Sequence, residues 1–114
     1  MSIVIWHNPR CSKSRAGVKY LEEKGVDFEI VKYLDNPPGT EEIREVLNKM
    51  GLSARELMRT KEATYRELKL KEVEDEDALI AEMAEHPKLI ERPVVIHGDK
   101  AVIGRPAEAI GAIL

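Results

Sequence analysis

The sequence predicts one α/β domain built on a mixed sheet. Three observations carry this prediction: a strand, a helix and a second strand open the chain, the central stretch is helical, and a tight hairpin followed by a short helix ends it. Parallel strands need a crossover such as the first helix, whereas hairpin strands pair antiparallel, so one sheet holds both pairings. The 114 residues suit a single compact domain. We therefore expect residues 1–114 to form one domain with a helical insertion at about 40–90.

The N-terminal strand–helix–strand unit follows from local patterns. Residues 3–6 are apolar and rich in β-branched side chains, and Pro9 lies in the loop that follows them. Residues 12–24 suit a helix that stops at Gly25. Residues 27–33 then alternate polar and apolar side chains, which is typical of a half-buried strand.

The central stretch carries several helix start and stop signals. Thr40 is a good N-cap, and apolar side chains recur behind it at helical spacing. Ser53 and Glu56 have the spacing of a capping box, and a further turn is expected over residues 63–68. Asp75 can cap a last helix that should end before Pro87. These signals predict an all-helical insertion.

A hairpin and a short helix complete the predicted fold. Residues 94–97 and 100–103 are strand-like, and Gly98-Asp99 suits the turn between them. Pro106 can occupy the first position of a final helix, because proline is favoured there. The apolar side of that helix would consist of Ala109, Ile110 and Ile113.

Composition narrows the possible partners. With 18 Lys+Arg against 21 Asp+Glu, the net charge of −3 gives no general attraction for nucleic acid or an anionic membrane. Apolar runs are too short to cross a bilayer, and the first residues lack the pattern of a secretory signal. We therefore expect a cytoplasmic monomer that binds neither nucleic acid nor membrane, and any anion site must be local.

The sequence contains one cysteine, Cys11, at the start of the first predicted helix. Helix N-terminal amides and nearby cations stabilise a thiolate, and Arg10, Lys13 and Arg15 are close in sequence. The same amides can cradle an oxyanion beside the sulfur. His7 could supply a proton or a further positive charge, depending on its protonation. Cys11 and His7 are thus the candidate catalytic residues.

Simpler interpretations stay open at this stage. Cys11 could be a buried space-filling residue, although its polar and basic neighbours argue against that. The basic residues could be a solvated helix start. With a single thiol no internal disulfide can form, and three scattered histidines show no ligand spacing, so we expect no metal site.

Three further arginines stand where predicted elements are interrupted: Arg59, Arg92 and Arg105. A guanidinium fork presents paired donors that match a tetrahedral oxyanion. The interpretation that each is an ordinary surface arginine is left open. Arg92-Pro93 and Arg105-Pro106 are taken to stand at opposite ends of the hairpin, so their side chains would meet only if one leans along a strand edge.

Four segments together resemble the glutaredoxin-coupled arsenate reductase family, and the resemblance spans nearly the whole chain. They are residues 7–15 (HNPRCSKSR), 34–38 (LDNPP), 86–93 (HPKLIERP) and 104–106 (GRP). Membership implies a thioredoxin-like fold of βαβ, helical insertion and ββα. It also implies a cis peptide at Arg92-Pro93 that faces the Cys11 loop.

The resemblance also implies roles for particular residues. Cys11 matches the nucleophilic cysteine of the family, His7 matches the histidine near the thiol, and Arg59, Arg92 and Arg105 match the three arginines that bind the oxyanion. In the family scheme the cysteine attacks arsenate, glutathione joins the arsenic adduct, and glutaredoxin then reduces it so that arsenite leaves. Glutathione would be a co-substrate, and no bound cofactor is expected. A single thiol fits this scheme, because the electrons must come from external thiols.

Two departures and two alternatives accompany the resemblance. Ser12-Lys13 follows Cys11 where arsenate reductases tend to have Gly-Thr, and the sequence ends at Leu114 without their longer tail, which favours the arsenate-reductase-like branch. Spx-type regulators share the fold and bind RNA polymerase, but Ser14 stands where their redox switch typically has its second cysteine. A glutathione-dependent thiol transferase is the other alternative; it would need Cys11 but not all three arginines.

Overall fold

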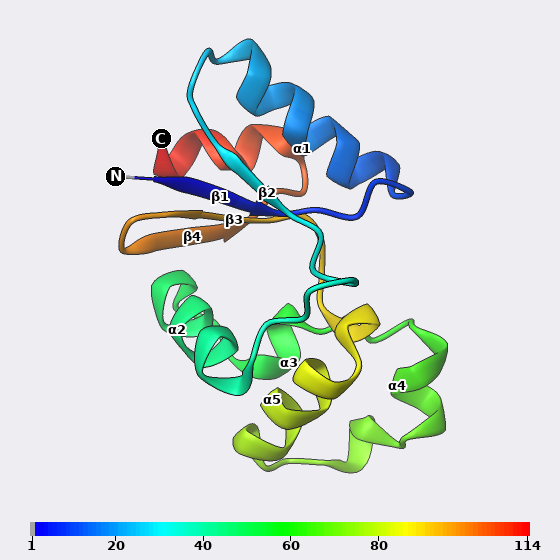
Figure 1. The fold of residues 1–114 in the computed structure, drawn as a ribbon. Coiled ribbons are helices and arrows are strands. Elements are labelled where there is room, and N and C mark those ends of the chain that lie inside the picture. Colours follow the sequence, from blue (N-terminus) through cyan, green and yellow to red (C-terminus); the bar gives the residue numbers. More distant parts are fainter. Residues whose placement is uncertain (1) are drawn as a thin grey trace. The chain divides into compact units, whose positions relative to one another are not determined.

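The protein is described by a computed structural model covering residues 2–114, which fall into two compact units (Figure 1). The first unit, called here the thiol unit, combines the chain up to Asn36 with Arg92–Leu114. The second, called the helical unit, is Pro37–Glu91. The helices expected at about 40–90 all belong to the helical unit. That residues 1–114 act as one domain stays a prediction.

The thiol unit contains the predicted mixed sheet. Its strands are β1 (Ile3–Trp6), β2 (Glu29–Val31), β3 (Val94–His97) and β4 (Lys100–Ile103). In residues 2–114 they lie in the order β2-β1-β3-β4, with β1 and β2 parallel and the other two pairs antiparallel. The α/β class and the mixed sheet are confirmed.

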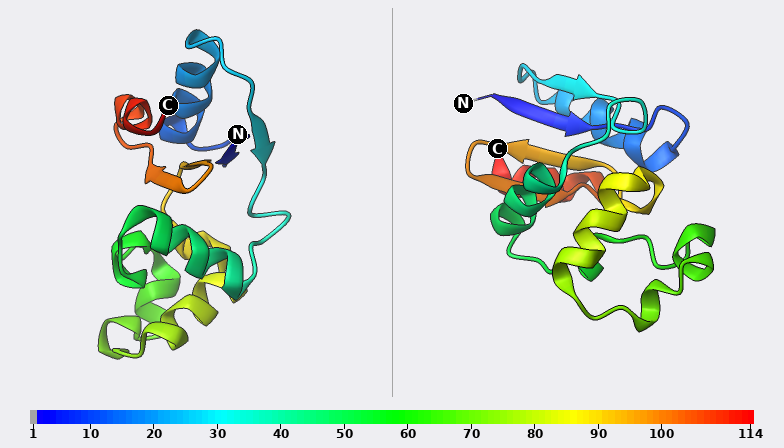
Figure 2. Two further views of the ribbon diagram at one scale, coloured as in Figure 1. Left: turned by 90° about the vertical axis from the view of Figure 1, so that its left-hand side faces the viewer. Right: turned by 60° about the horizontal axis from the view of Figure 1, so that its bottom comes forward.

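Two helices cover one face of this sheet, as Figures 1 and 2 show: α1 (Ser12–Glu23) and the 3-10 helix η3 (Ala107–Ile113). Side chains from β1, α1, β3 and η3 form the buried core between them, which consists of Ile3, Ile5, Leu21, Val95, Ile110 and Ile113. Strand residues two apart share a face, so Ile3 and Ile5 both point towards the helices. Burial of this cluster is what attaches α1 to the sheet.

Two predictions for this unit were wrong in detail. The second strand spans three residues rather than 27–33, because the chain turns after Lys32, whose carbonyl accepts from the N–H groups of Asp35 and Asn36. Its Ile30 is 45% exposed, not buried. The last helix begins after Pro106, whose ψ of 169° is extended, and it is a 3-10 helix.

Pro93 is packed against two glycines. A Cβ added at Gly17 of α1 would lie 2.9 Å from the Pro93 ring, and one added at Gly104 would lie 3.0 Å from it. The predicted cis peptide at Arg92-Pro93 is confirmed, and Arg105-Pro106 is also cis. Because Gly17 and Gly104 have no side chain, the segment that contains Arg92 can approach α1 closely.

The helical unit agrees closely with the predicted elements. It contains α2 (Thr40–Met50), α3 (Ala54–Leu57), α4 (Ala63–Glu67), η1 (Leu70–Glu72), α5 (Glu76–Glu85) and η2 (Pro87–Leu89). The capping box is present, since Glu56 Oε1 accepts from the Ser53 N–H at 2.9 Å. Gly39, not Thr40, is the N-cap of α2.

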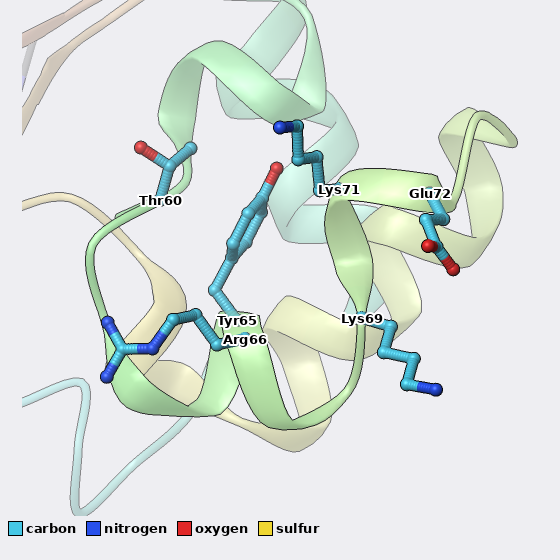
Figure 3. Close-up of a pocket in the computed structure, with 6 residues that line it drawn as sticks. All are labelled: Thr60, Tyr65, Arg66, Lys69, Lys71 and Glu72. Carbon is cyan, nitrogen blue, oxygen red and sulfur yellow. The ribbon is translucent and has the colours of Figure 1, made fainter.

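Arg55 holds the segment between α3 and α5 in place through hydrogen bonds. Its guanidinium donates to the Tyr65 hydroxyl and to the carbonyls of Leu70 and Val73. A cavity of about 310 Å³ lies beside Tyr65, and its lining residues are Thr60, Tyr65, Arg66, Lys69, Lys71 and Glu72 (Figure 3). The side chains of Lys69 and Glu72 extend away from Tyr65 in this view, so the charged groups do not converge on one point.

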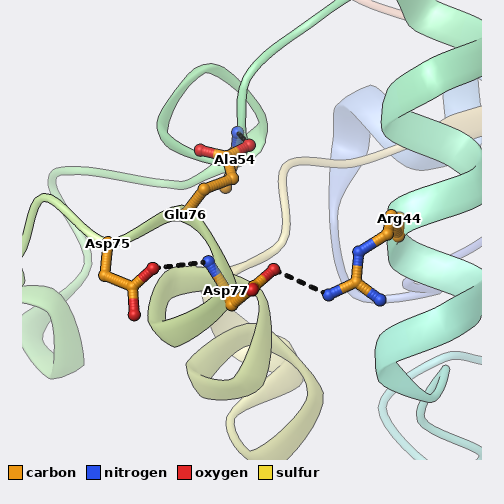
Figure 4. Close-up of polar contacts among 5 residues, drawn as sticks. All are labelled: Arg44, Ala54, Asp75, Glu76 and Asp77. Atoms are coloured by element: carbon orange, nitrogen blue, oxygen red, sulfur yellow. Dashed lines mark hydrogen bonds and ion pairs between the residues drawn. The ribbon is translucent and has the colours of Figure 1, made fainter.

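Polar contacts also hold α5 within the helical unit (Figure 4). Asp75 caps α5 as predicted, accepting from the N–H of Asp77. Arg44 of α2 pairs with Asp77 at 2.8 Å, and Glu76 accepts from the N–H of Ala54 at 2.8 Å. None of the helices within residues 2–114 combines the length and apolarity that a bilayer crossing requires.

Candidate active site

Cys11 lies at the N-cap of α1, in the loop that leads out of β1. Its N–H donates to the carbonyl of Asn8 at 3.0 Å, and its carbonyl accepts from Arg15 N–H at 3.0 Å, which is the first turn of the helix. The Asn8 side chain accepts from the Arg10 N–H, which fixes the loop further. The half-buried sulfur therefore lies at the start of α1, where the first backbone N–H groups have no hydrogen-bond partner within the helix.

The surroundings of Cys11 favour its thiolate. Burial alone would raise the pKa of the thiol, but the N–H of Ser14, the side chain of Arg92 and the N–H of Lys13 bond to the sulfur, and the Arg92 charge is close. Together these interactions outweigh burial and lower the pKa of Cys11 below its ordinary value. The donors around the sulfur thus form a site that stabilises negative charge, and a role of Cys11 as a nucleophile stays a prediction.

Arg92 is the cation that reaches the sulfur directly. Its Nε donates to Cys11 Sγ at 3.2 Å, across 81 positions of sequence. The expectation that neighbouring basic side chains supply the charge was inaccurate: Lys13 acts through its backbone N–H, and Arg15 donates to the carbonyl of Pro9 at 2.9 Å. The decisive charge comes from a distant segment, which local spacing cannot reveal.

Ser14 is a site residue that the sequence analysis passed over. Its side chain is fully buried, and its Oγ accepts from the Asn8 N–H at 2.9 Å and bonds to His7 Nδ1 at 2.6 Å. The available signal was a polar residue on the buried face of α1, four and seven positions before Val18 and Leu21. Ser14 therefore links His7, the loop and the helix start.

His7 is buried, and its surroundings favour the neutral imidazole. Burial lowers its pKa most, and the charges of Lys32 and Arg15 lower it further. The hydrogen bonds found in residues 2–114 join His7 to Ser14 and Val31 rather than to Cys11. Of the two options left open for His7, a standing positive charge is disfavoured, and its catalytic role stays a prediction.

Arg105 follows β4 in the thiol unit, and the expectation that it stands at the opposite end of the hairpin from Arg92 was wrong. Antiparallel pairing joins Val94 to Ile103, so the residues before β3 and after β4 meet at the same open end. The N–H of Gly104 donates to the carbonyl of Pro93 at 2.8 Å. The hairpin itself therefore brings the two Arg-Pro segments side by side.

Arg59 belongs to the helical unit. Its N–H donates to the Leu89 carbonyl at 2.7 Å, and its Nη1 donates to the Lys88 carbonyl and lies 3.3 Å from Glu62. The guanidinium is partly exposed, with 27% of the side chain accessible. The convergence of Arg59 with the thiol stays a prediction.

One group of possible metal ligands occurs within the part of the chain that the structure describes: Glu82, Glu85 and His86, at the end of α5. Exposed acidic groups often cluster in this way without an ion. His86 Nε2 lies 3.8 Å from Glu82 Oε2 across one helical turn, as in an ordinary helix-surface pair. This group gives no support for a metal centre.

Comparison with known proteins agrees with this geometry. The sequence model of the ArsC family matches residues 6–113. The chain belongs to the ArsC family. A protein named arsenate reductase from Neisseria meningitidis serogroup A is 53% identical over 114 residues, covering 98% of this chain and 97% of the relative. Another from Haemophilus influenzae is 44% identical over the full length of both chains.

A solved structure extends the likeness from sequence to fold. The structure titled arsenate reductase from Vibrio cholerae superimposes with a TM-score of 0.96 at 47% identity, covering 100% of this chain and 98% of that one. The fold is therefore the thioredoxin-like fold of ArsC-family proteins. The predicted family and fold are both confirmed.

Proposed function

We propose that this protein is a glutathione- and glutaredoxin-dependent arsenate reductase whose nucleophile is the Cys11 thiolate. The observation that carries the proposal is the position of the sulfur, which accepts from helix N-terminal amides and from the Nε of Arg92 at 3.2 Å. Relatives at 53% and 44% identity bear the name arsenate reductase. The same donors that stabilise the thiolate can stabilise an oxyanion that it attacks.

The first chemical step is attack of Cys11 Sγ on arsenic. A sulfur–arsenic bond forms, one arsenic–oxygen bond breaks, and the oxygen leaves as water after gaining protons, while arsenic stays pentavalent. Arg92 precedes β3 and Arg105 follows β4, so both belong to the same open end of the hairpin, which supports a role in holding the remaining oxygens. His7 would serve this step through Ser14, which fixes the loop around the sulfur.

Arg59 is the third proposed oxyanion ligand. Its interaction with Glu62 holds the guanidinium in one region, but the carboxylate also offsets part of its positive charge. Binding of arsenate through Arg59 therefore requires that the oxyanion compete with Glu62 for the same donors.

The second stage transfers two electrons to arsenic. Two external thiols give up one electron each and join as a disulfide, so arsenic becomes trivalent, arsenite leaves and the Cys11 thiolate is restored. Overall, one arsenate and two thiols yield one arsenite, one disulfide and one water. Because this chain has a single cysteine, glutathione and glutaredoxin are proposed as the thiol donors.

Arsenite formation from arsenate, glutathione and glutaredoxin tests this function. The purified chain should produce one arsenite per disulfide, and Cys11→Ser should produce none, whereas the neighbouring Ser12→Ala should remain active because Ser12 is exposed. Cys11-dependent reduction of a glutathione mixed disulfide with no arsenite formation would instead favour the thiol transferase.

A further inference from the structure

We propose that Arg10 and Lys13 are specificity residues of the proposed reaction: they favour a thiol co-substrate that carries negative charge over a neutral or cationic one. This selection rests on the proposed function, because that function requires external thiols, and it defines the chemical class of the thiol. The residues concerned all belong to the thiol unit.

Arg10 is held in a tight turn directly before Cys11. The Cys11 N–H donates to the Asn8 carbonyl at 3.0 Å, and the Asn8 side chain accepts from the Arg10 N–H at 3.0 Å. Asparagine at the first position and proline at the second are typical of such a turn. Arg10 is exposed, and because consecutive Cα atoms are about 3.8 Å apart, its charge stays in the neighbourhood of the sulfur.

Lys13 follows Cys11 in the first turn of α1. Its N–H bonds to the sulfur, so its backbone has a fixed place in the site, while the residue is exposed to solvent. The ion pairs found in residues 2–114 involve neither Lys13 nor Arg10. The two side chains therefore place positive charge on both sides of Cys11 in the chain, with no paired carboxylate to offset it.

Other groups stabilise the thiolate. The cation that bonds to Cys11 Sγ is Arg92, with its Nε at 3.2 Å, and the Arg92 charge helps to lower the pKa of Cys11. Arg15 donates to the Pro9 carbonyl at 2.9 Å. The two exposed cations thus remain available to a group that approaches the sulfur from solvent.

The N-terminal segment carries positive charge only. Residues 1–21 contain Arg10, Lys13, Arg15 and Lys19 but neither Asp nor Glu, although the chain as a whole has more acidic than basic residues. The first turn of α1 has no acidic residue, unlike those of α2 and α5. A carboxylate is stabilised at a helix start, so its absence leaves the positive end of α1 free to attract an anion.

An incoming thiol meets negative charge at this site, because arsenate bound to Cys11 retains charged oxygens. An anionic thiol is repelled by that adduct unless cations are near. Arg10 and Lys13 supply such cations, apart from the arginines proposed to hold the oxyanion, and they raise the rate at which an anion arrives. Glutathione, whose carboxylates outnumber its ammonium group, belongs to the favoured class.

The test compares three methanethiosulfonates at Cys11: the sulfonatoethyl (anionic), methyl (neutral) and trimethylammonioethyl (cationic) reagents. In each case the thiolate attacks the divalent sulfur, a mixed disulfide forms and methanesulfinate leaves. Arg10→Gln and Lys13→Gln should each lower the anionic-to-neutral rate ratio by about two- to fivefold, as expected for exposed charges, and raise the cationic-to-neutral ratio. The neutral rate should not change.

Two controls accompany these variants. Lys19→Gln removes an exposed cation about two turns along α1 from Cys11, and it should leave all three rates unchanged. High salt should lower the anionic-to-neutral ratio of the wild type, because it screens exposed charges. Unchanged ratios in Arg10→Gln and Lys13→Gln, or a neutral rate that falls as much as the anionic one, would overturn the selection, even where arsenite is produced.

Arsenite production with simple thiols separates this inference from the proposed function. The double variant of Arg10→Gln and Lys13→Gln should lose rate with anionic 3-mercaptopropionate but not with neutral 2-mercaptoethanol. An equal loss with both thiols would assign the two cations to arsenate and overturn the selection. No arsenite from any thiol, with the methanethiosulfonate ratios as expected, would refute the proposed reduction and leave the preference of Cys11 for anionic reactants standing.

Discussion

The two units of the chain carry different kinds of interactions. In the thiol unit, polar contacts are concentrated around Cys11 Sγ, which accepts hydrogen bonds from Arg92 and from backbone amides. The buried Ser14 joins His7 to the same loop. In the helical unit, polar contacts cap helices or join segments, as Arg55 does by donating to the Tyr65 hydroxyl and the Val73 carbonyl. The comparison teaches that an arginine can favour a thiolate in one unit, as Arg92 does, and hold backbone segments together in the other, as Arg55 does.

The sharpest test of this contrast compares Arg92 with Arg59. Arg92→Ala removes a charge-assisted hydrogen bond to sulfur, so it should raise the pKa of Cys11 and lower arsenate turnover by about ten- to a hundredfold. Arg59→Ala should lower turnover if it binds arsenate, but it should leave the pKa of Cys11 unchanged. Turnover and the pH dependence of alkylation measure the two effects separately.

Lysine variants refine that result. Arg92→Lys and Arg105→Lys should restore little turnover, because an ammonium cannot offer the planar fork. Wild-type turnover in the lysine forms of Arg59, Arg92 and Arg105 would contradict bidentate binding of the oxyanion.

Arg55→Ala should lower the stability of the helical unit and leave the reactivity of Cys11 unchanged. The substitution leaves the Tyr65 hydroxyl and two carbonyls without this donor, at a cost of about 2 kcal/mol or more in unfolding free energy. Hydrogen exchange should rise in Pro37–Glu91, and the pKa of Cys11 should not move. The exposed pair of Arg44 and Asp77 supplies the control, since Arg44→Ala should cost less than about 1 kcal/mol.

Ser14→Ala should affect the thiol unit by a smaller amount. It leaves the Asn8 N–H without its Oγ acceptor, which costs about 1–3 kcal/mol, and it frees His7 Nδ1. Alkylation of Cys11 should slow because the loop loses its fixed geometry. Unchanged stability and alkylation in Ser14→Ala, judged against the exposed Ser12→Ala, would show that Ser14 does not organise the site.

The sequence predicted elements better than contacts. The caps at Ser53 and Asp75, the hairpin and the crossover helix were predicted correctly, because each depends on residues close in sequence. The length of β2 and the exposure of Ile30 were not, since they depend on where the sheet ends. The same division applies to the site.

For the site, the sequence identified Cys11 and its helix N-terminus but misjudged which cation acts on the sulfur. Arg92 arrives from 81 positions away, and two glycines that admit Pro93 help to place it. Such close approaches depend on tertiary packing, which no local pattern encodes. Ser14 was visible as a polar residue on an apolar helix face, but its partners were not.

Gly17→Ala gives the smallest expected effect and tests that packing. Alanine stabilises a helix interior by about 1 kcal/mol relative to glycine, but the new methyl would meet the Pro93 ring at 2.9 Å. We expect little net gain in stability and a several-fold slower alkylation of Cys11, because a shift of the Pro93 ring would also move Arg92, the residue directly before it. Gly39→Ala is the control for alkylation only, since a Cβ there meets nothing within 4 Å, whereas its stability differs for another reason because Gly39 is the N-cap of α2.

The most direct test of the account is the rate of Cys11 alkylation by iodoacetamide across pH, read by mass spectrometry. The lowered pKa of Cys11 predicts that the rate reaches half its maximum below the free-thiol value of about 8.5. Arg92→Ala should move that midpoint upward, and sulfate or arsenate should slow the wild-type reaction by occupying the same donors. A midpoint at about 8.5 or higher, with no protection by either oxyanion, would contradict a thiolate site at Cys11.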